Sequence, residues 1–315
     1  MLDVVCVGIL VADVVVQNIE NLPETGMLQP VDRIELFSGG CASNAAIGMA
    51  RLGLNVAVAG KIGDDGFGCF LKKTLTDEKV NIDSLCVDKN VNTSGSIVII
   101  DKSGERSFLH YKGANAAFSV KDISHSIIEQ AEIVFVAGTF LMPEFDGEQC
   151  ASLLKKAKSM GKITALDTAW DASGKWMNVL RPCMEHIDLF MPSYDEAVCL
   201  SGKKEPDEIE DVFLDMGVKT AVIKLGHKGC LIKDSSGEKH YIPAFEGIRA
   251  VDTTGAGDSF CAGFLTGIRK GWSLDKCGIL ANATGAHCVM ATGSVTGIKS
   301  FEETMNFIKE RSVFA

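Results

Sequence analysis

The chain has 315 residues, of which 46% are hydrophobic and 23% charged, and this composition is typical of a globular enzyme built as one large domain or a domain with an appendage. Its formal net charge of -10 repels nucleic-acid phosphates and anionic lipid, and no stretch approaches the roughly 20 uninterrupted apolar residues that span a bilayer, so we expect neither nucleic-acid nor membrane partners. The eleven cysteines contain no Cys-x-x-Cys pair, which favours free thiols in a cytoplasmic protein over disulfides or a zinc site.

The first predicted element is a strand at 4–9, where Asp3 and Asp13 interrupt the apolar run and argue against a signal peptide. Strands and helices then alternate along the chain. In order, they are a helix at 42–52, a strand at 56–60, a helix at 68–78, a strand at 133–137, a helix at 147–159, strands at 163–167 and 187–191, a helix at 207–216, a strand at 220–225, and helices at 258–270 and 274–290. We expect the last two helices to cover one side of the sheet. The alternation predicts an α/β fold with three layers (α/β/α) and a mainly parallel central sheet.

Two regions break this alternation. Residues 13–19 with 31–37, and 95–100 with 107–111, alternate apolar and polar positions around turn signals, which predicts antiparallel hairpins with one solvated face. No low-complexity linker or internal repeat sets them apart from the rest of the chain. We therefore expect one domain over 1–315, with the strands of a small β-sheet lid inserted at about 13–37 and 95–111.

Residues 251–260, which read VDTTGAGDSF before an apolar helix, carry the strongest chemical signal. Gly255, Ala256 and Gly257 leave backbone N–H groups unshielded at the start of a helix, where the helix dipole adds positive potential. This makes an anion hole suited to a transferring phosphoryl group. Asp258 would lie beside it, as a base that takes the proton of an attacking hydroxyl.

A bare Gly-Ala-Gly-Asp string would also fit a helix N-terminus with Asp258 or Ser259 as cap. The full string, however, resembles the C-terminal signature of the PfkB (ribokinase-like) carbohydrate kinases. The resemblance implies a ribokinase-like fold and an ATP-dependent kinase that phosphorylates an alcohol group, with ATP and Mg²⁺ as cofactors. It also assigns Asp258 as the catalytic base.

The N-terminal half is similar to the same family at residues 39–46, which read GGCASNAA. The resemblance implies that Gly39, Gly40 and Asn44 bind the sugar, because glycines allow a close backbone approach and Asn44 offers both a donor and an acceptor. Asp13 matches the family's substrate-binding carboxylate. We interpret residues 60–68, GKIGDDGFG, as a glycine-rich turn from strand to helix rather than a dinucleotide fingerprint.

The nucleotide side follows the same resemblance. Residues 224–229, KLGHKG, are similar to the family's strand and turn along the ATP ribose and phosphates, which assigns Lys224, Gly226 and Gly229 to the nucleotide. A plain hairpin turn is the alternative. Asn282 matches a position that borders the adenine, and a polar residue on a buried helix can equally make a core hydrogen bond.

Two further positions concern metal ions. Asp252 and Thr254 match the place where many relatives hold a monovalent cation such as K⁺, although Asp252 can instead brace the anion-hole turn. Many relatives carry an Asn-x-x-Glu motif for Mg²⁺-bound waters, and this chain has Ser193 where they have asparagine. We expect Glu196 to act on Mg²⁺ through water. Ser193 and Glu196 also fit a capping box.

The lid segment 105–115 is similar to that of ribokinases and fructokinases. It lacks the arginine near Tyr111 with which kinases of keto-deoxy sugar acids hold a carboxylate, although Lys112 or Arg106 can substitute. A neutral sugar or polyol is favoured, with a fructose-like hexose or ribose first. Trp170 can stack on a ligand or lie in the core.

The sequence thus favours an ATP-dependent kinase of a sugar hydroxyl. A nucleoside kinase of the same family, or a non-catalytic sensor of sugar or nucleotide, stays open as the alternative. An intact Gly255–Gly257 turn and Asp258 argue against the sensor, which has no need of a base. The alternating apolar lid strands suggest a homodimer formed through the lid.

Overall fold

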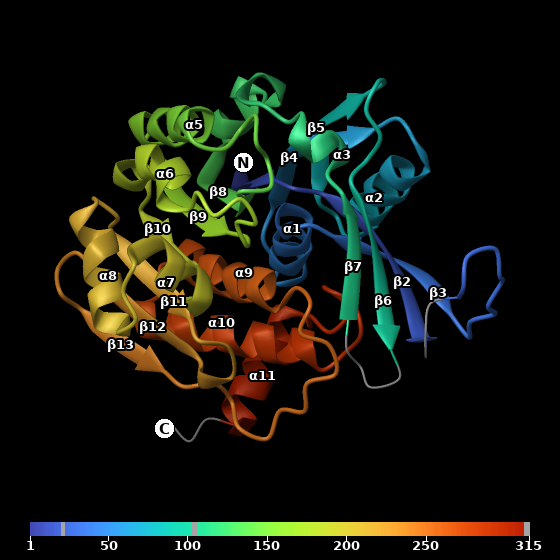
Figure 1. Ribbon diagram of the computed structural model, residues 1–315. Helices are drawn as coiled ribbons and strands as arrows, with labels where there is room; N and C mark the ends of the chain where they lie inside the picture. The colour runs from blue at the N-terminus through green and yellow to red at the C-terminus, as the bar shows by residue number, and fades with distance from the viewer. Residues whose placement is uncertain (20–22, 102–105, 312–315) are drawn as a thin grey trace.

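The computed structural model describes residues 1–19, 23–101 and 106–311 (Figure 1). The predicted turn signals at Leu22 and at 103–104 lie outside the described residues, as does the side chain of Arg106. None of the helices in the described part of the chain is long and apolar enough to cross a membrane.

The main sheet has nine strands in the order β13-β12-β11-β10-β9-β8-β1-β4-β5. Its strands are β1 (Leu2–Gly8), β4 (Val56–Gly63), β5 (Asn81–Asp88), β8 (Ala131–Thr139), β9 (Ile163–Thr168), β10 (Leu189–Phe190), β11 (Thr220–Lys224), β12 (Cys230–Asp234) and β13 (Lys239–Ile242). The seven strands from β11 to β5 pair in parallel, and only the edge strands β12 and β13 pair antiparallel. The predicted mainly parallel sheet is confirmed. Its parallel strands all end at one edge, where open α/β sheets bind ligands.

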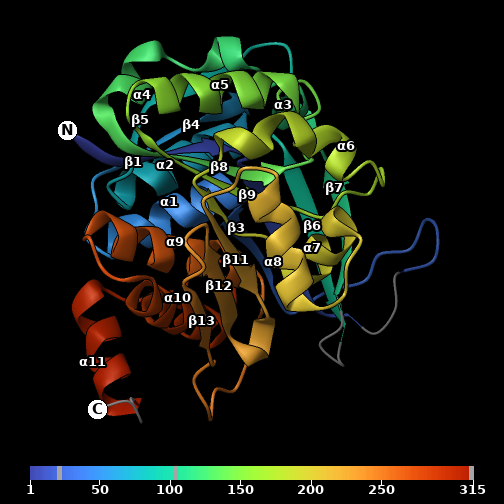
Figure 2. The ribbon, with the colours of Figure 1, turned by 90° about the vertical axis from the view of Figure 1, so that its left-hand side faces the viewer.

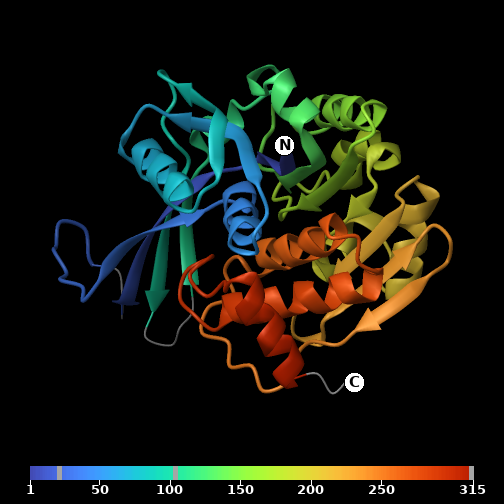
Figure 3. The ribbon, with the colours of Figure 1, turned by 180° about the vertical axis from the view of Figure 1, so that it is seen from behind.

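Helices cover both faces of this sheet, as predicted. One face packs against α1 (Cys41–Arg51), α2 (Gly66–Asp77), α9 (Ala256–Arg269) and α10 (Leu274–Val289), and the other packs against α4 (His125–Gln130), α5 (Glu148–Ser159), α6 (Met177–Leu180), α7 (Tyr194–Ser201) and α8 (Pro206–Asp215). In Figure 2 the sheet lies between α8 and α9, and Figure 3 shows α1, α9 and α10 side by side. Outside these layers, α11 (Phe301–Arg311) packs on α10.

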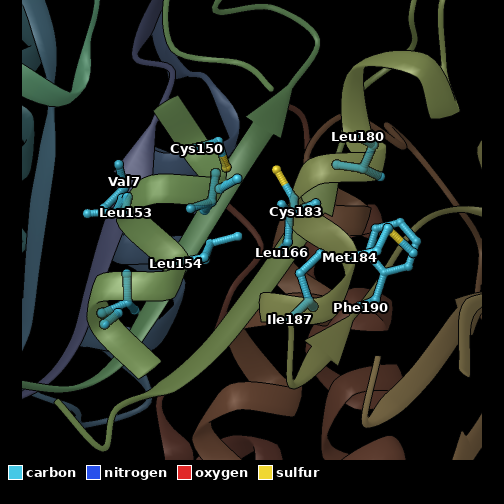
Figure 4. Close-up of a cluster of buried hydrophobic side chains, with 14 of the residues drawn as sticks. Val7, Cys150, Leu153, Leu154, Leu166, Leu180, Cys183, Met184, Ile187 and Phe190 are labelled. Atoms are coloured by element: carbon cyan, nitrogen blue, oxygen red, sulfur yellow. The ribbon is translucent and has the colours of Figure 1, made fainter. Parts of the chain in front are cut away.

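The alternation of side chains along β1 explains the two cores. Val5 and Val7 point into the cluster with α5, whereas Val4 and Cys6 point into the cluster with α1 and α9. Figure 4 shows the first of these clusters, where Leu153 and Leu154 of α5 pack near the sheet. Both faces of the strand are therefore buried, which is why its sequence is a continuous apolar run.

The lid is a separate four-stranded sheet in the order β3-β2-β6-β7. Its strands are β2 (Val11–Ile19), β3 (Ile34–Gly39), β6 (Gly95–Asp101) and β7 (Arg106–Tyr111). Both predicted hairpins are antiparallel, and β2 joins them by pairing in parallel with β6. The sheet projects beside the main sheet on the right of Figure 1. Short α3 (Gly113–Ala116) follows it, and Asn115 holds Leu10 at the start of β2 through bonds of 3.1 and 2.9 Å.

Candidate active site

The turn for which we predicted an anion hole lies directly before α9. Gly255 has a left-handed φ of 76° at the N-cap, and a Cβ there would lie 2.2 Å from the Ser294 carbonyl oxygen, so only glycine fits. The helix begins at Ala256, and the N–H groups of its first turn have no acceptor within the helix. Because α9 runs for 14 residues, its dipole adds positive potential at this end.

Asp258 lies in the first turn of α9, as predicted. Its Oδ2 accepts a hydrogen bond of 2.8 Å from the amide Nδ2 of Asn44, which comes from α1. Burial raises the pKa of Asp258, whereas the Asn44 bond and the charge of Lys224 oppose that rise. The carboxylate is thus held beside the N-terminus of α9, where it can accept a proton.

Lys224 supplies a cation to the same place. Its Nζ bonds Asp167 at the end of β9 through both carboxylate oxygens, at 2.8 and 2.7 Å, and the two side chains are only 11% and 3% exposed. The Asp167 charge raises the pKa of Lys224, which keeps the ammonium protonated despite its burial. A Cβ on Gly257 would lie 3.3 Å from this Nζ, so the ammonium borders the anion hole directly.

A cavity of about 520 Å³ opens from the start of α9 toward residues 244–250 and α10. All four residues that the resemblance assigns to the nucleotide line it, together with the start of α9: Lys224, Gly226, Gly229, Asn282, Ala256 and Gly257. The 224–229 segment is a hairpin turn between β11 and β12, so the alternative reading of its local structure also holds. Asn282 Nδ2 donates to the Ile242 and Pro243 carbonyls, both at 3.1 Å, so this residue also makes the alternative core bonds.

The sequence did not reveal the rest of this cavity wall. One side of α10 faces the cavity through Asn282, Gly285, Ala286 and Val289. Counted from Asn282, their spacing of three, four and seven residues is the spacing of one helix face. Small residues at these positions could therefore have predicted from the sequence that this face of the helix lines a cavity.

Asp13 lies at the lid end of the site. A Cβ on Gly39 would lie 2.0 Å from Asp13 Oδ2, and a Cβ on Gly40, whose φ is 91°, would lie 2.5 Å from the Ile9 carbonyl oxygen. Gly39 therefore lets the signature turn pass close to the carboxylate, and Gly40 lets it pass close to the backbone of Ile9. Burial raises the pKa of Asp13 to about 6, against a hydrogen bond from Ser96 and with a smaller effect of Asp258.

The register of the lid adds residues that the sequence did not single out. Phe37, Asp13, Ser96 and His110 form one cross-strand row, because each is paired with the next. The Ser96 hydroxyl lies 3.2 Å from His110 Nδ1. Lys112, two residues after His110 in the chain, is exposed. Burial and the charge of Lys112 together lower the pKa of His110. Asp13 thus lies in a polar row on the lid.

The side chain of Asn44 is buried and bonds two residues from the C-terminal part of the chain. Its Nδ2 donates to Asp258, and its Oδ1 accepts from the Ser294 hydroxyl at 2.9 Å. Among the described residues this leaves one amide hydrogen of Asn44 without a partner. Asn44 therefore fixes the position of the Asp258 carboxylate.

The predicted metal positions have partners of their own. Glu196 Oε2 accepts from the Ser193 backbone N–H at 2.9 Å and from Thr168 Oγ1 at 3.1 Å, and the capping box is present. Asp252 accepts from the N–H groups of Thr254 and Gly293, both at 2.9 Å, and so braces the turn. Within the described ranges, no group of three His, Cys, Asp or Glu side chains is arranged to hold a metal.

Trp170 is not a core residue. Its side chain is 56% exposed after β9, and its ring lies 5.0 Å from that of Trp176 in an edge-to-face arrangement. Trp176 contacts Phe140 in the same way at 5.6 Å. The aromatic cluster therefore stands at the carboxyl edge of β8 and β9.

Comparisons with known proteins agree with this geometry. The model of the pfkB family carbohydrate kinases matches residues 1–300. Probable fructokinase-5 of Arabidopsis thaliana is 29% identical over 295 residues, which cover 87% of this chain and 89% of that protein. The 2-dehydro-3-deoxygluconokinase of Bacillus subtilis is 27% identical, with 90% of each chain covered. The structure of Arabidopsis thaliana ribokinase complexed with ribose and ATP superposes with a TM-score of 0.87 at 25% identity, covering 98% of this chain and 99% of that one.

Proposed function

The chain belongs to the pfkB family of carbohydrate kinases, which are ATP-dependent phosphotransferases, and we propose that its acceptor is a neutral sugar or polyol, a fructose-like hexose or ribose first. One observation carries the proposal: Asp258 lies between the nucleotide-sized cavity beyond Lys224 and the polar lid row around Asp13. A hydroxyl held from the lid side and a phosphoryl group held from the cavity side meet at this carboxylate.

The residues support in-line transfer. Asp258 takes the proton of the sugar hydroxyl while that oxygen forms a bond to the γ-phosphorus, and the bond from phosphorus to the β,γ-bridging oxygen breaks to release ADP. The N–H groups of residues 255–257 and the Lys224 ammonium stabilise the charge on the phosphoryl oxygens. Mg²⁺ on the ATP phosphates would neutralise further charge. Glu196, whose Oε1 makes no bond to a described residue, would hold one of its waters.

We also propose that a monovalent cation such as K⁺ lies by the turn that Asp252 braces. The Asp252 carboxylate accepts the N–H groups of Thr254 and Gly293, both at 2.9 Å, and its negative charge at this turn suits a cation. Replacing K⁺ by a bulky organic cation in the assay should lower activity if this site is filled.

A neutral acceptor fits the charges of the site. The carboxylate of Asp258 is influenced by those of Asp13, Asp167 and Glu196, and the buried ammonium of Lys224 opposes them. In this setting a sugar carboxylate would be repelled, whereas hydroxyl groups can donate to Asp13. Lys112 is exposed at the end of the lid, and we assign it to the rim of the sugar site.

ADP release with ATP, Mg²⁺ and a panel of acceptors tests the proposal. The panel contains fructose, ribose, a cyclitol, a nucleoside and a keto-deoxy sugar acid, and we expect turnover with one of the first three. Turnover only with the nucleoside would make the protein a nucleoside kinase. Binding of sugar or nucleotide without any ADP release would make it a sensor.

We predict that sugar affinity depends on the protonation of Asp13. Because the pKa of Asp13 is raised to about 6, the carboxylate that accepts sugar hydroxyls is fully formed only above that pH. KM for the sugar should therefore rise about tenfold between pH 7 and pH 5, while the Kd for ATP changes little. Asp13→Asn should give a KM that no longer varies over this range. A wild-type KM that stays flat would remove Asp13 from sugar binding.

We further propose a homodimer through the lid. Leu36, Val14, Ile97 and Leu109 form the cross-strand row next to that of Asp13, and side chains of neighbouring rows alternate between the faces of the sheet. Ile97 is 44% exposed and Leu109 63%, so the described residues leave this apolar face uncovered. Light scattering should give a dimer for the wild type and a monomer for Ile97→Lys with Leu109→Lys. A monomeric wild type would refute the dimer.

We propose that one kinase domain spans 1–315, with the lid strands inserted at about 13–37 and 95–111. A cytosolic location is part of the same proposal. All eleven cysteines are free, and seven of them are buried, so they suit a reducing compartment.

A further inference from the structure

The hydroxyl of Ser294 links the lid to the catalytic base. Ser294 is 2% exposed, and its Oγ lies 2.6 Å from the Ser38 carbonyl oxygen and 2.9 Å from Asn44 Oδ1. Both partners are acceptors, whereas the hydroxyl has a single hydrogen, so that hydrogen serves the two bonds. Ser38 is the penultimate residue of the lid strand β3, which ends at Gly39, and Asn44 bonds Asp258.

The backbone of Ser294 is fixed to the anion hole. Its carbonyl oxygen accepts a hydrogen bond from Cys288 Sγ at 3.2 Å. The same oxygen packs against Gly255, where a Cβ would lie 2.2 Å from it. The next residue is also held, because Arg51 Nη1 donates to the Val295 carbonyl. The backbone that carries the hydroxyl is thus held in place on both sides.

The amide of Asn44 has two orientations that exchange its oxygen and nitrogen. The carboxylate of Asp258 requires the N–H₂ side, which turns the amide oxygen toward Ser294, and the Ser294 hydroxyl donates to that oxygen and so stabilises this orientation. Without the Ser294 hydroxyl, Oδ1 of Asn44 would be buried without a donor, since the residue is 3% exposed. The amide orientation that presents N–H₂ to Asp258 would then be less stable relative to the flipped one.

We propose that Ser294 is a positioning residue, which orients Asn44 toward Asp258 and ties the end of the lid strand to the same amide. The role rests on the proposed function, because it acts on the base of that reaction. It couples the lid, which holds the sugar, to the carboxylate that deprotonates it. The direct bond between the motif that contains Asn44 and the motif that contains Asp258 is therefore supported by a third segment, which contains Ser294.

The test follows the protonation of Asp258 in Ser294→Ala. Charged and titratable groups that act on Asp258 from the neighbouring elements are unchanged in this variant: Lys224, Glu196, Asp13, Asp167, Cys41, Cys261, Cys288 and Cys6. Loss of the Asn44 bond to the carboxylate should shift the midpoint of Asp258 upward by about one pH unit. Carboxyl ¹³C NMR on the protein without substrate measures it, with Asp258→Asn assigning the signal.

Turnover gives the second readout. In Ser294→Ala we expect kcat at pH 7 to fall about tenfold and its acid limb to move to higher pH, with the Kd for ATP unchanged. Ser294→Thr keeps the hydroxyl and should restore the wild-type pH profile. Ser300→Ala removes a hydroxyl that bonds only Glu303 at the start of α11, and it should leave both readouts as in the wild type.

An Asp258 signal that titrates in Ser294→Ala as in the wild type would overturn the proposal, whether or not a sugar is found. A shifted signal in a protein that phosphorylates no acceptor would instead refute the kinase reaction and keep the positioning role. If Ser294→Ala unfolds, an unshifted pH profile in Ser294→Cys, whose thiol donates weakly, would overturn the proposal, and a shifted profile would support it.

Discussion

Asp258→Asn should lower kcat by about three orders of magnitude or more, because it removes the only proton acceptor at the start of α9 while keeping the size of the side chain. Its carbonyl oxygen can still accept the bond from Asn44 Nδ2, so the fold should survive. The cavity lined by Gly226, Gly229 and Asn282 is untouched. The Kd for ATP should therefore stay near that of the wild type, as calorimetry can measure.

Asp275→Asn provides the matched control. Asp275 lies in the first turn of α10, the helix that packs against α9, so this variant makes the same chemical change in the first turn of a neighbouring helix. Its turnover should equal that of the wild type. Asp258→Asn within tenfold of wild-type kcat would exclude Asp258 as the base.

The fold was largely readable from the sequence because the parallel strands are buried on both faces. Such strands are continuous apolar runs, and β1 and β8 show this clearly. The edge strands lack that signal: β5 has a single fully buried position, and β13 has none. The strand predicted at 187–191 is only Leu189–Phe190, because Pro192 and the Ser193 cap begin the next turn. Local periodicity thus identifies the centre of a sheet better than its edges.

The candidate site divides in the same way. The Gly255–Gly257 turn and Asp258 are contiguous, so a local motif predicts their shared geometry. Asn44 and Asp258 are 214 residues apart, and Ser294 and Asn44 are 250 apart. Nothing in the local sequence of these residues encodes their contact, which depends on how α1 packs on α9. The Asp167–Lys224 pair arises from the alignment of β9, β10 and β11 in one sheet.

Lys224→Met should have the second large effect, on stability and activity together. It leaves the Asp167 carboxylate, which is 3% exposed, without its partner, and this should lower the free energy of unfolding by about 3–5 kcal/mol. It also removes the ammonium from beside Gly257, so kcat/KM should fall by about 10²–10³ even in the folded fraction. Lys233→Met is the control, because Lys233 pairs with the exposed Asp211 at the surface.

A second substitution separates the two effects of Lys224. Asp167→Asn combined with Lys224→Met removes both charges, so most of the lost stability should return while activity stays low. The stability of Lys224→Met alone should also depend on pH. Burial raises the pKa of Asp167 above its value in the unfolded chain, so the penalty is present at pH 8 and shrinks as the pH falls and the carboxyl group takes up a proton. If the double variant regained wild-type turnover along with its stability, Lys224 would be a structural partner of Asp167 and not a ligand of the transferring phosphoryl group.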